Sequence, residues 1–457
     1  MKIEKSIKEY AIHGEKYVLV FIILICVYML SLIGASLIPS NWMKDNVVKS
    51  SEILKTEGEK KCINIGYKDV YMFLFTDALM INTAYSIDSN SPVESALLDR
   101  KNYIPGQTLI VHKDQQYNLG ASKNYVDAYG NVFQTAELYG LMHGEDITDS
   151  YEYARYWHGY LVILRPLLVL TSYKEIRITL LVLMIALVGF MMYLLTKKSN
   201  IKIAIIFLLG LFFANVFIAT QSFNEIIVFF IAIISSIYLL LKKDVDKNIG
   251  INFLVIGSVT AFMDLLTEPL VTLGIPLAVY FLLTEKKNKM IKENIITFIK
   301  LCVCWAIGYG LTWATKWIIT SIICNRSMIQ NAIIQAKYRT ENQSISYVKV
   351  LERNLSFLSY FIPFISIAIA GTYTIIRLII NRNEKFNIKK NVQIALPYLF
   401  IGILPFAWYS VLKQHSMIHS FFTYRILCIT VICLFIITEK LTIFEKEKKE
   451  EKCKKQL

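Results

Sequence analysis

The sequence has few charged residues, and this scarcity decides its broad class. Only 18% of the 457 residues are Asp, Glu, Lys or Arg, and 55% are hydrophobic. Typical soluble domains are about 25% charged. Several apolar runs reach about 18 residues or more, which is enough to cross a hydrocarbon core of about 30 Å. The composition therefore excludes a soluble globular protein and predicts a multi-pass helical protein in a lipid bilayer.

The sequence also lacks a disulfide framework. Of its eight cysteines, only Cys62 lies plainly in a predicted external loop. Cys302 and Cys304 share an apolar helix, where packing is favoured over a metal site. No internal repeat, low-complexity linker or separate soluble domain is evident.

The net charge of +14 would suit a nucleic-acid-binding protein, but its distribution argues against one. The lysines gather at the ends of apolar runs, as topology signals do, so no nucleic-acid partner is expected.

We predict about ten transmembrane helices in an all-α membrane fold. They are placed at residues 17–38, 178–196, 201–220, 223–241, 251–264, 268–283, 296–323, 356–380, 392–411 and 420–438. With these spans, every lysine-rich turn falls on one face, so both termini are predicted to be cytoplasmic.

The predicted organisation has four parts. They are a cytoplasmic N-terminus with the first transmembrane helix (1–38), a large extracytoplasmic loop with interfacial or re-entrant helices (39–177), a polytopic transmembrane domain (178–438), and a basic cytoplasmic tail (439–457). The first helix is longer than a usual signal-peptide core and lacks an Ala-x-Ala-like cleavage site, which favours a retained anchor. The abundance of Lys, Ile and Asn suggests an AT-rich bacterial genome, and hence the bacterial plasma membrane.

A single apolar run at residues 251–283 is interrupted by Asp264, Glu268 and Pro269. As one helix it would be roughly 50 Å long at 1.5 Å per residue, far more than the bilayer core. It would also place the flanking lysines on opposite sides of the membrane. We therefore predict a broken, hairpin-like span whose tip lies at or below the outer surface.

Two stretches of the large loop are apolar but do not suit a full span. Residues 160–170 are too short to cross the membrane and contain Arg165 and Pro166, so a re-entrant or interfacial segment is predicted. Residues 67–83 are amphiphilic and carry Asp69 and Asp77, which favours a helix lying at the interface.

Ionisable residues at a membrane are costly and often functional, and here the candidates lie on the predicted outer face. Asp77 has apolar neighbours that would raise the pKa of its carboxyl toward the range of a general base, although a plain surface carboxylate is the equal alternative. Asp264 and Glu268 have two interpretations, a cap for the hairpin or part of an active site.

Arginine, tryptophan and histidine come together in the stretch from Arg155 to Arg165. Arg155, Trp157 and His158 suit either an aromatic belt at the membrane surface or a platform for sugar and phosphate. Arg165 adds a further cation for a phosphate.

The last outer turn contains His415 and His419 at a spacing of four, with Arg425 nearby. If this turn is helical, the two imidazoles share a face. Anion binding with Arg425 and ordinary polar helix-end residues remain open as interpretations, and two histidines without a third ligand are weak evidence for a metal.

One reaction would use all of these groups: transfer of a sugar from a polyprenyl phosphate outside the membrane. The leaving phosphate needs cations, the acceptor hydroxyl needs a carboxylate base, and the sugar needs an aromatic surface.

Four phrases carry a resemblance to known families: TDALM at 76–80, RYWHGYLVILRPLL at 155–168, FMDLLTEPLVTLGIPL at 262–277 and HSMIHSFFTYR at 415–425. They resemble a family of polytopic membrane proteins of low-GC Gram-positive bacteria, and the layout looks like the GT-C superfamily of membrane glycosyltransferases. The resemblance implies that the base is an acidic residue of the first external loop, which best matches Asp77 and then Asp69. The chain lacks the compact Asp-Asp or Glu-x-Asp pair of better-known members, so the base and a divalent metal requirement stay open.

We therefore expect a membrane glycosyltransferase that takes a lipid-linked sugar donor and modifies a cell-envelope glycan acceptor. In this scheme Asp264 and Glu268 orient the acceptor or a metal. The alternatives are a polysaccharide polymerase or ligase of another membrane fold, and a non-enzymatic flippase or transporter of lipid-linked sugars. Transporters tend to place polar residues at mid-membrane in repeated halves, which this sequence does not do.

Overall fold

The computed structural model describes residues 2–66, 69–103, 134–144, 149–287, 290–340, 345–380, 382 and 388–441. Much of the predicted external loop (104–133) and most of the predicted basic tail (442–457) lie outside this part.

The described chain contains seven helices that are long and apolar enough to cross a membrane. They are α1 (Lys2–Ser36), α7 (Tyr173–Lys198), α10 (Phe223–Leu241), α13 (Ile291–Ile323), α16 (Phe361–Ile380), α17 (Ile388–Val411) and the run Ser420–Leu441, which ends in α20 (Leu427–Leu441). Three other predicted spans are shorter apolar helices, namely α8 (Ile201–Phe213), α11 (Ile249–Met263) and α12 (Val271–Thr284). The prediction of a multi-pass helical membrane protein is confirmed.

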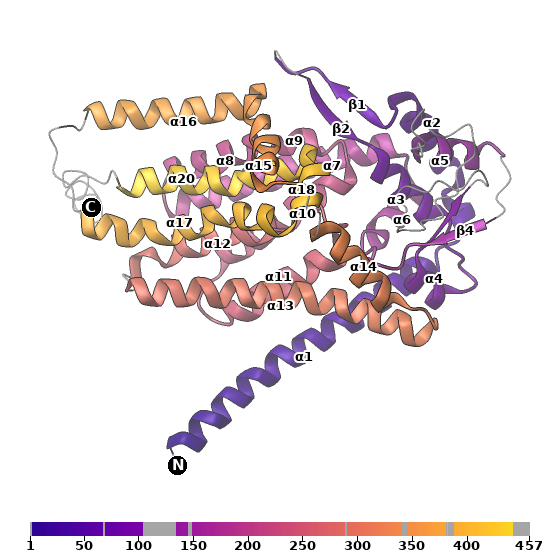
Figure 1. Ribbon diagram of the computed structural model, residues 1–457, viewed down its shortest axis with the longest axis horizontal. Helices are drawn as coiled ribbons and strands as arrows, with labels where there is room; N and C mark the ends of the chain where they lie inside the picture. Colours follow the sequence, from indigo (N-terminus) through magenta and orange to yellow (C-terminus); the bar gives the residue numbers. More distant parts are fainter. Residues whose placement is uncertain are drawn as a thin grey trace.

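The helices α8, α10, α11, α12, α13, α16, α17 and α20 form an elongated bundle (Figure 1). The described residues of the stretch 39–172, which we call the loop segment, gather at one end of this bundle, the loop end. Helix α1 begins and α20 ends toward the opposite end. One hydrophobic core extends from Met43 and Ala78 in the loop segment to Ile436 in α20, so the two regions pack together.

Helices α11 and α13 make the most extensive helix pair, and two glycines allow their close approach. A Cβ at Gly257 would lie 2.1 Å from the carbonyl oxygen of Trp305, and one at Gly308 would lie 2.1 Å from that of Leu254. Small residues that let backbones meet are a common device for packing helices in membranes.

The apolar run at 251–283 is broken, as the sequence predicts. Helix α11 ends at Met263 and α12 begins at Val271. Their 15 and 14 residues correspond to helices of about 21–23 Å, shorter than a hydrocarbon core of about 30 Å. Neither helix is therefore long enough to cross such a core alone.

The described part of the loop segment contains short helices and four strands. Its elements are η1 (Ser40–Met43), α2 (Lys44–Glu57), β1 (Lys60–Ile63), β2 (Val70–Phe73), α3 (Phe75–Tyr85), α4 (Pro92–Leu98), β3 (Arg100–Tyr103), α5 (Gln134–Met142), β4 (Asp149–Glu152) and α6 (Leu161–Leu170). β1 pairs with β2 and β3 with β4, both antiparallel. The all-α prediction misses these two small sheets.

The prediction of one interfacial helix over residues 67–83 is wrong for residues 70–73, which form β2, and its residues 67 and 68 lie outside the described part of the chain. The second half is α3, and α3 is largely buried because it packs against α5 and α6. Residues 160–170 do form a short apolar helix, α6, with Pro166 inside it.

Short helices also connect the later spans. They are α9 (Val216–Ala219), η3 (Glu285–Lys287), α14 (Met328–Thr340), α15 (Tyr347–Leu355), η4 (Ser356–Ser359), α18 (Lys413–Ile418), α19 (Ser420–Thr423) and η5 (Tyr424–Ile426). Helices α14 and α15 both contact α18, so they hold the turn between α17 and α20 in place.

Candidate functional site

The loop between α11 and α12 positions two buried carboxylates. Asp264 follows the last residue of α11 and is 2% exposed. Its Oδ1 accepts hydrogen bonds from the backbone N–H of Thr267 at 3.0 Å and from the Thr267 hydroxyl at 2.5 Å. Burial raises the pKa of Asp264 to about 6, although the Thr267 hydrogen bonds act in the opposite direction. A carboxyl with such a pKa can exchange a proton near neutral pH.

Glu268 belongs to a buried charge triad with Arg425 and Glu225. Arg425 Nη1 lies 2.5 Å from Glu225 Oε2 and 3.3 Å from Glu268 Oε1, and all three side chains are at most 1% exposed. Arg425 Nε also donates to the carbonyl oxygen of Ala214 at 3.1 Å. Because an unpaired buried charge is very costly, the two carboxylates and the guanidinium stabilise one another. The triad connects α10, the α11–α12 loop and the short turn η5 (Tyr424–Ile426) that precedes α20.

His415 and His419 lie beside this loop. Their rings are 4.8 Å apart, and electrostatic contact with the backbone of Leu266 and Thr267 brings His415 against the α11–α12 loop. Burial lowers the pKa of His415 well below its usual value, with His419 and Arg339 adding to the effect. Burial and Arg339 lower the pKa of His419 to about 4. Both imidazoles are therefore neutral at pH 7.

Arg339, from α14, is the cation that meets the histidines. Its Nη1 lies 3.4 Å from His415 Nδ1, and its Nη2 donates to the Tyr156 hydroxyl at 2.9 Å. Arg339 is half-buried. The sequence offered a signal, because the loop before α16 carries Lys337 and Arg339, but only the structure brings Arg339 to the histidines.

Aromatic rings line the same region. Tyr156 meets Trp313 edge-to-face with ring centroids 5.3 Å apart, and Tyr309 lies 5.8 Å from Trp313. The Tyr309 hydroxyl is within electrostatic range of Asp264 and Arg339. Tyr156 thus joins the predicted platform of the loop segment to helix α13.

We call this group of seven ionisable residues the loop-end cluster. Its members are Glu225, Asp264, Glu268, Arg339, His415, His419 and Arg425. Within the described part of the chain, the cluster atoms Glu268 Oε2, His415 Nε2 and His419 Nδ1 are buried without a hydrogen-bond partner, as is the neighbouring Tyr309 hydroxyl. Glu225 Oε2 has its ion pair with Arg425. Buried polar atoms are normally paired, so atoms of this kind are places for a bound water or a substrate group.

Asp77 lies next to the cluster, but its carboxylate is already fully engaged. It accepts hydrogen bonds from the Tyr173 hydroxyl, from the Ser222 hydroxyl at 2.7 Å, and from the backbone N–H groups of Phe223 at 2.8 Å and Asn224 at 3.3 Å. Ser222, Phe223 and Asn224 form the N-terminus of α10, where a carboxylate is stabilised by the helix dipole, and Tyr173 begins α7. Burial nevertheless raises the pKa of Asp77. This geometry is that of an anchor between α3, α7 and α10.

Two other predicted site residues are engaged elsewhere in the loop segment. Asp69 lies just before β2 and interacts with the Cys62 thiol of β1. Arg165 donates to the carbonyl oxygens of Ala35, Ile38 and Ala84, so it joins the end of α1 to α3. Neither side chain belongs to the loop-end cluster.

The platform residues next to Tyr156 mainly support the fold. Trp157 Nε1 donates to the carbonyl oxygen of Thr312 at 2.6 Å. His158 contacts the Tyr160 hydroxyl and the carbonyl oxygen of Tyr153, and burial lowers the pKa of His158 to about 3. Arg155 lies over the Tyr153 ring, 5.1 Å from its centroid. Trp157 and His158 are buried and Arg155 is half-buried.

Among the described residues, no group of three or more His, Cys, Asp or Glu side chains is placed so that it could bind a divalent metal ion.

Comparison of the chain with protein-family models, with curated proteins and with solved structures finds no match.

Proposed function

We propose that this protein is a GT-C-like glycosyltransferase of the bacterial plasma membrane, acting on the outer face. In this proposal it crosses the membrane about ten times and keeps both termini in the cytoplasm. The donor is a polyprenyl-phosphate-linked sugar, and the acceptor is a hydroxyl of a cell-envelope glycan. The observation that carries the proposal is the loop-end cluster, where chain segments around residues 225, 264–268, 339 and 415–425 converge.

The cluster's depth supports a lipid-linked substrate. Glu225 is in the first turn of α10, and Asp264 and Glu268 follow a helix too short to cross the bilayer alone. Such a site lies near the level where the phosphate of a membrane lipid meets its tail. Irregular backbone at this depth is tolerated where it lines a polar site within the protein.

In the proposed reaction, Asp264 is the general base. Its carboxylate takes the proton of the acceptor hydroxyl while that oxygen bonds to the anomeric carbon of the sugar. The bond from this carbon to the phosphate oxygen breaks, and the lipid phosphate leaves with the bonding electrons. Since phosphate is a good leaving group, no strong general acid is required.

Arg339 is the proposed partner of the leaving phosphate. The structure gives Arg425 two carboxylate partners and keeps His415 and His419 uncharged, so these three residues do not supply net positive charge. The half-buried guanidinium of Arg339 does. Neutral imidazoles can still donate hydrogen bonds to a phosphate oxygen.

Transfer by purified protein in liposomes tests the proposal, with synthetic polyprenyl-phosphate sugars as donors. Wild-type protein transfers sugar, and Asp264→Asn lowers the rate by about 10²–10⁴-fold, the usual contribution of a general base. Asp88→Asn, an exposed carboxylate of the loop segment, serves as the control and keeps full activity. Full activity of correctly folded Asp264→Asn would show that Asp264 is not the general base. A lack of transfer by wild type with every donor would contradict the proposal of glycosyltransferase activity.

A further inference from the structure

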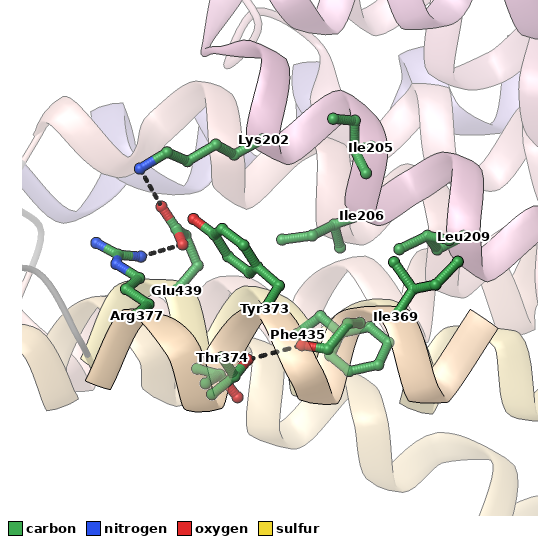
Figure 2. Close-up of a pocket in the computed structure, with 12 residues that line it drawn as sticks. Lys202, Ile205, Ile206, Leu209, Ile369, Tyr373, Thr374, Arg377, Phe435 and Glu439 are labelled. Carbon is green, nitrogen blue, oxygen red and sulfur yellow. Dashed lines mark hydrogen bonds and ion pairs between the residues drawn. The ribbon is translucent and has the colours of Figure 1, made fainter. Parts of the chain in front are cut away.

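A groove at the end of the bundle opposite the loop segment has the form of a lipid site. It lies between α8, α16 and α20 and encloses a cavity of about 250 Å³ (Figure 2). Its walls are apolar, formed by side chains such as Ile206, Leu209, Ile369 and Phe435. Pockets for complete small molecules occupy roughly 300–1,000 Å³, so this cavity suits a single narrow chain.

One end of the groove is charged. Lys202 Nζ lies 3.8 Å from Glu439 Oε1, and Arg377 Nη1 pairs with the other oxygen of Glu439 (Figure 2). The Lys202 side chain is 45% exposed, whereas those of Arg377 and Glu439 are 7% and 10% exposed. Lys202 is the exposed cation at this end, whereas Arg377 and Glu439 are largely buried and each also makes further contacts.

The charged end is at the level expected for lipid headgroups. Lys202 is in the first turn of α8, directly after the basic pair Lys197 and Lys198. Arg377 is in the last turn of α16. The charged groups therefore mark the membrane surface at the lysine-rich end, and the apolar walls extend from there into the bilayer.

The position of α16 explains why a groove exists. Its larger contacts within the described chain are with α8, α20 and the adjoining η4, and it runs along the edge of the bundle (Figure 1). Many of its side chains are exposed, including Ile369 at 52%. In a membrane, this apolar space between α8 and α16 would be filled by a hydrocarbon chain and not by water.

We propose that the groove binds an anionic phospholipid of the leaflet at the lysine-rich end. One acyl chain lies between α8 and α16, and the phosphate contacts Lys202 beside the Arg377–Glu439 pair. The exposed Lys202 ammonium, with the basic pair Lys197 and Lys198 at the same end, favours anionic over zwitterionic lipid. The bound chain joins α16 to the rest of the bundle. This site is separate from the loop-end cluster and does not depend on the proposed enzyme activity.

Lipid-dependent stability tests the proposal on the full-length protein in mild detergent. Phosphatidylglycerol raises the midpoint of thermal unfolding of wild type, and phosphatidylcholine has at most half this effect. Lys202→Gln loses at least half of the phosphatidylglycerol shift. The matched control is Lys197→Gln, a lysine at the same end that does not line the groove, and it keeps the full shift.

A second variant and a direct count complete the test. Leu209→Trp is expected to fill the groove and abolish the phosphatidylglycerol shift in the unfolding midpoint. In native mass spectrometry, wild type is expected to retain one phosphatidylglycerol molecule. The fraction of protein with bound lipid is expected to be at least five-fold lower for Lys202→Gln. Glycerol phosphate, which has the headgroup charge but no chains, produces no shift. Equal shifts with both phospholipids, or a phosphatidylglycerol shift and retention that survive both substitutions, overturn the proposal.

Discussion

Asp77 and Asp264 look alike in the sequence, and their hydrogen-bond partners in the structure distinguish their roles. Its apolar neighbours suggest a general base with a raised pKa, and burial does raise it. The sequence could not reveal the Tyr173 and Ser222 hydroxyls and two backbone N–H groups that occupy the carboxylate, because they come from residues 96 to 147 positions away. Asp264 also has a raised pKa, but its hydrogen bonds come from its own loop.

Replacing Asp77 by Asn is expected to damage the fold. The amide NH₂ would face groups that donate hydrogen bonds, so buried donors lose their acceptor at a cost of about 1–3 kcal/mol. The midpoint of thermal unfolding in detergent measures this, with Asp88→Asn as an exposed control that leaves it unchanged. A fully stable Asp77→Asn protein that has lost transfer activity would instead support Asp77 as the base.

The pH dependence of transfer tests the assignment of Asp264. A general base must be ionised, so activity is lost as the pH falls through a value near the Asp264 pKa of about 6. The Thr267 hydroxyl donates to the carboxylate and lowers its pKa, so Thr267→Val is expected to move this limb to higher pH. An acidic limb that stays in place in Thr267→Val would assign it to another group.

At the scale of elements, apolar length and charge placement predict the helices well. The break between α11 and α12 is predictable because a single helix would be too long and would put the lysines on opposite sides. The strands β1 to β4 are missed because each has only four residues, too few for an alternating pattern to be recognised. Helices α14 and α15 are missed because they are short and polar, and they position Arg339 and the histidine turn.

The α11–α13 crossing gives a prediction at this scale. In Gly308→Ala, the added methyl group meets the Leu254 carbonyl oxygen, so the helices must separate at a cost of about 1–3 kcal/mol. At Gly310, two residues further along α13, an added methyl group would meet nothing within 4 Å, so Gly310→Ala is the matched control. Lower thermal stability in detergent is expected for Gly308→Ala alone. Equal stability of the two variants would contradict the close packing.

For the whole molecule, the sequence could predict which residues are polar and which side of the membrane they favour. It could not predict which of them meet. The sequence makes Arg425 a candidate for phosphate binding, but its pairing with Glu225 and Glu268 depends on the packing of α10 and α20 against the α11–α12 loop. Likewise, Arg165 uses its donors to hold backbone carbonyls from two distant segments.

The proposed topology can be checked with a native thiol. Cys62 lies in β1 of the loop segment and is exposed. In a variant whose other seven cysteines are replaced by serine or alanine, a membrane-impermeant maleimide is expected to label Cys62 on intact cells. Labelling that requires permeabilised cells would place the loop segment in the cytoplasm and contradict the proposed outer-face site.

The most direct test of the account is a structure of the protein bound to a polyprenyl phosphate in a lipid nanodisc. We predict that the phosphate lies within hydrogen-bond distance of Arg339, beside Asp264 and the two histidines, with the polyprenyl tail extending into the bilayer. A phosphate bound at the opposite end of the bundle, or a loop-end cluster that stays closed around its own side chains at saturating lipid, would contradict the central claim.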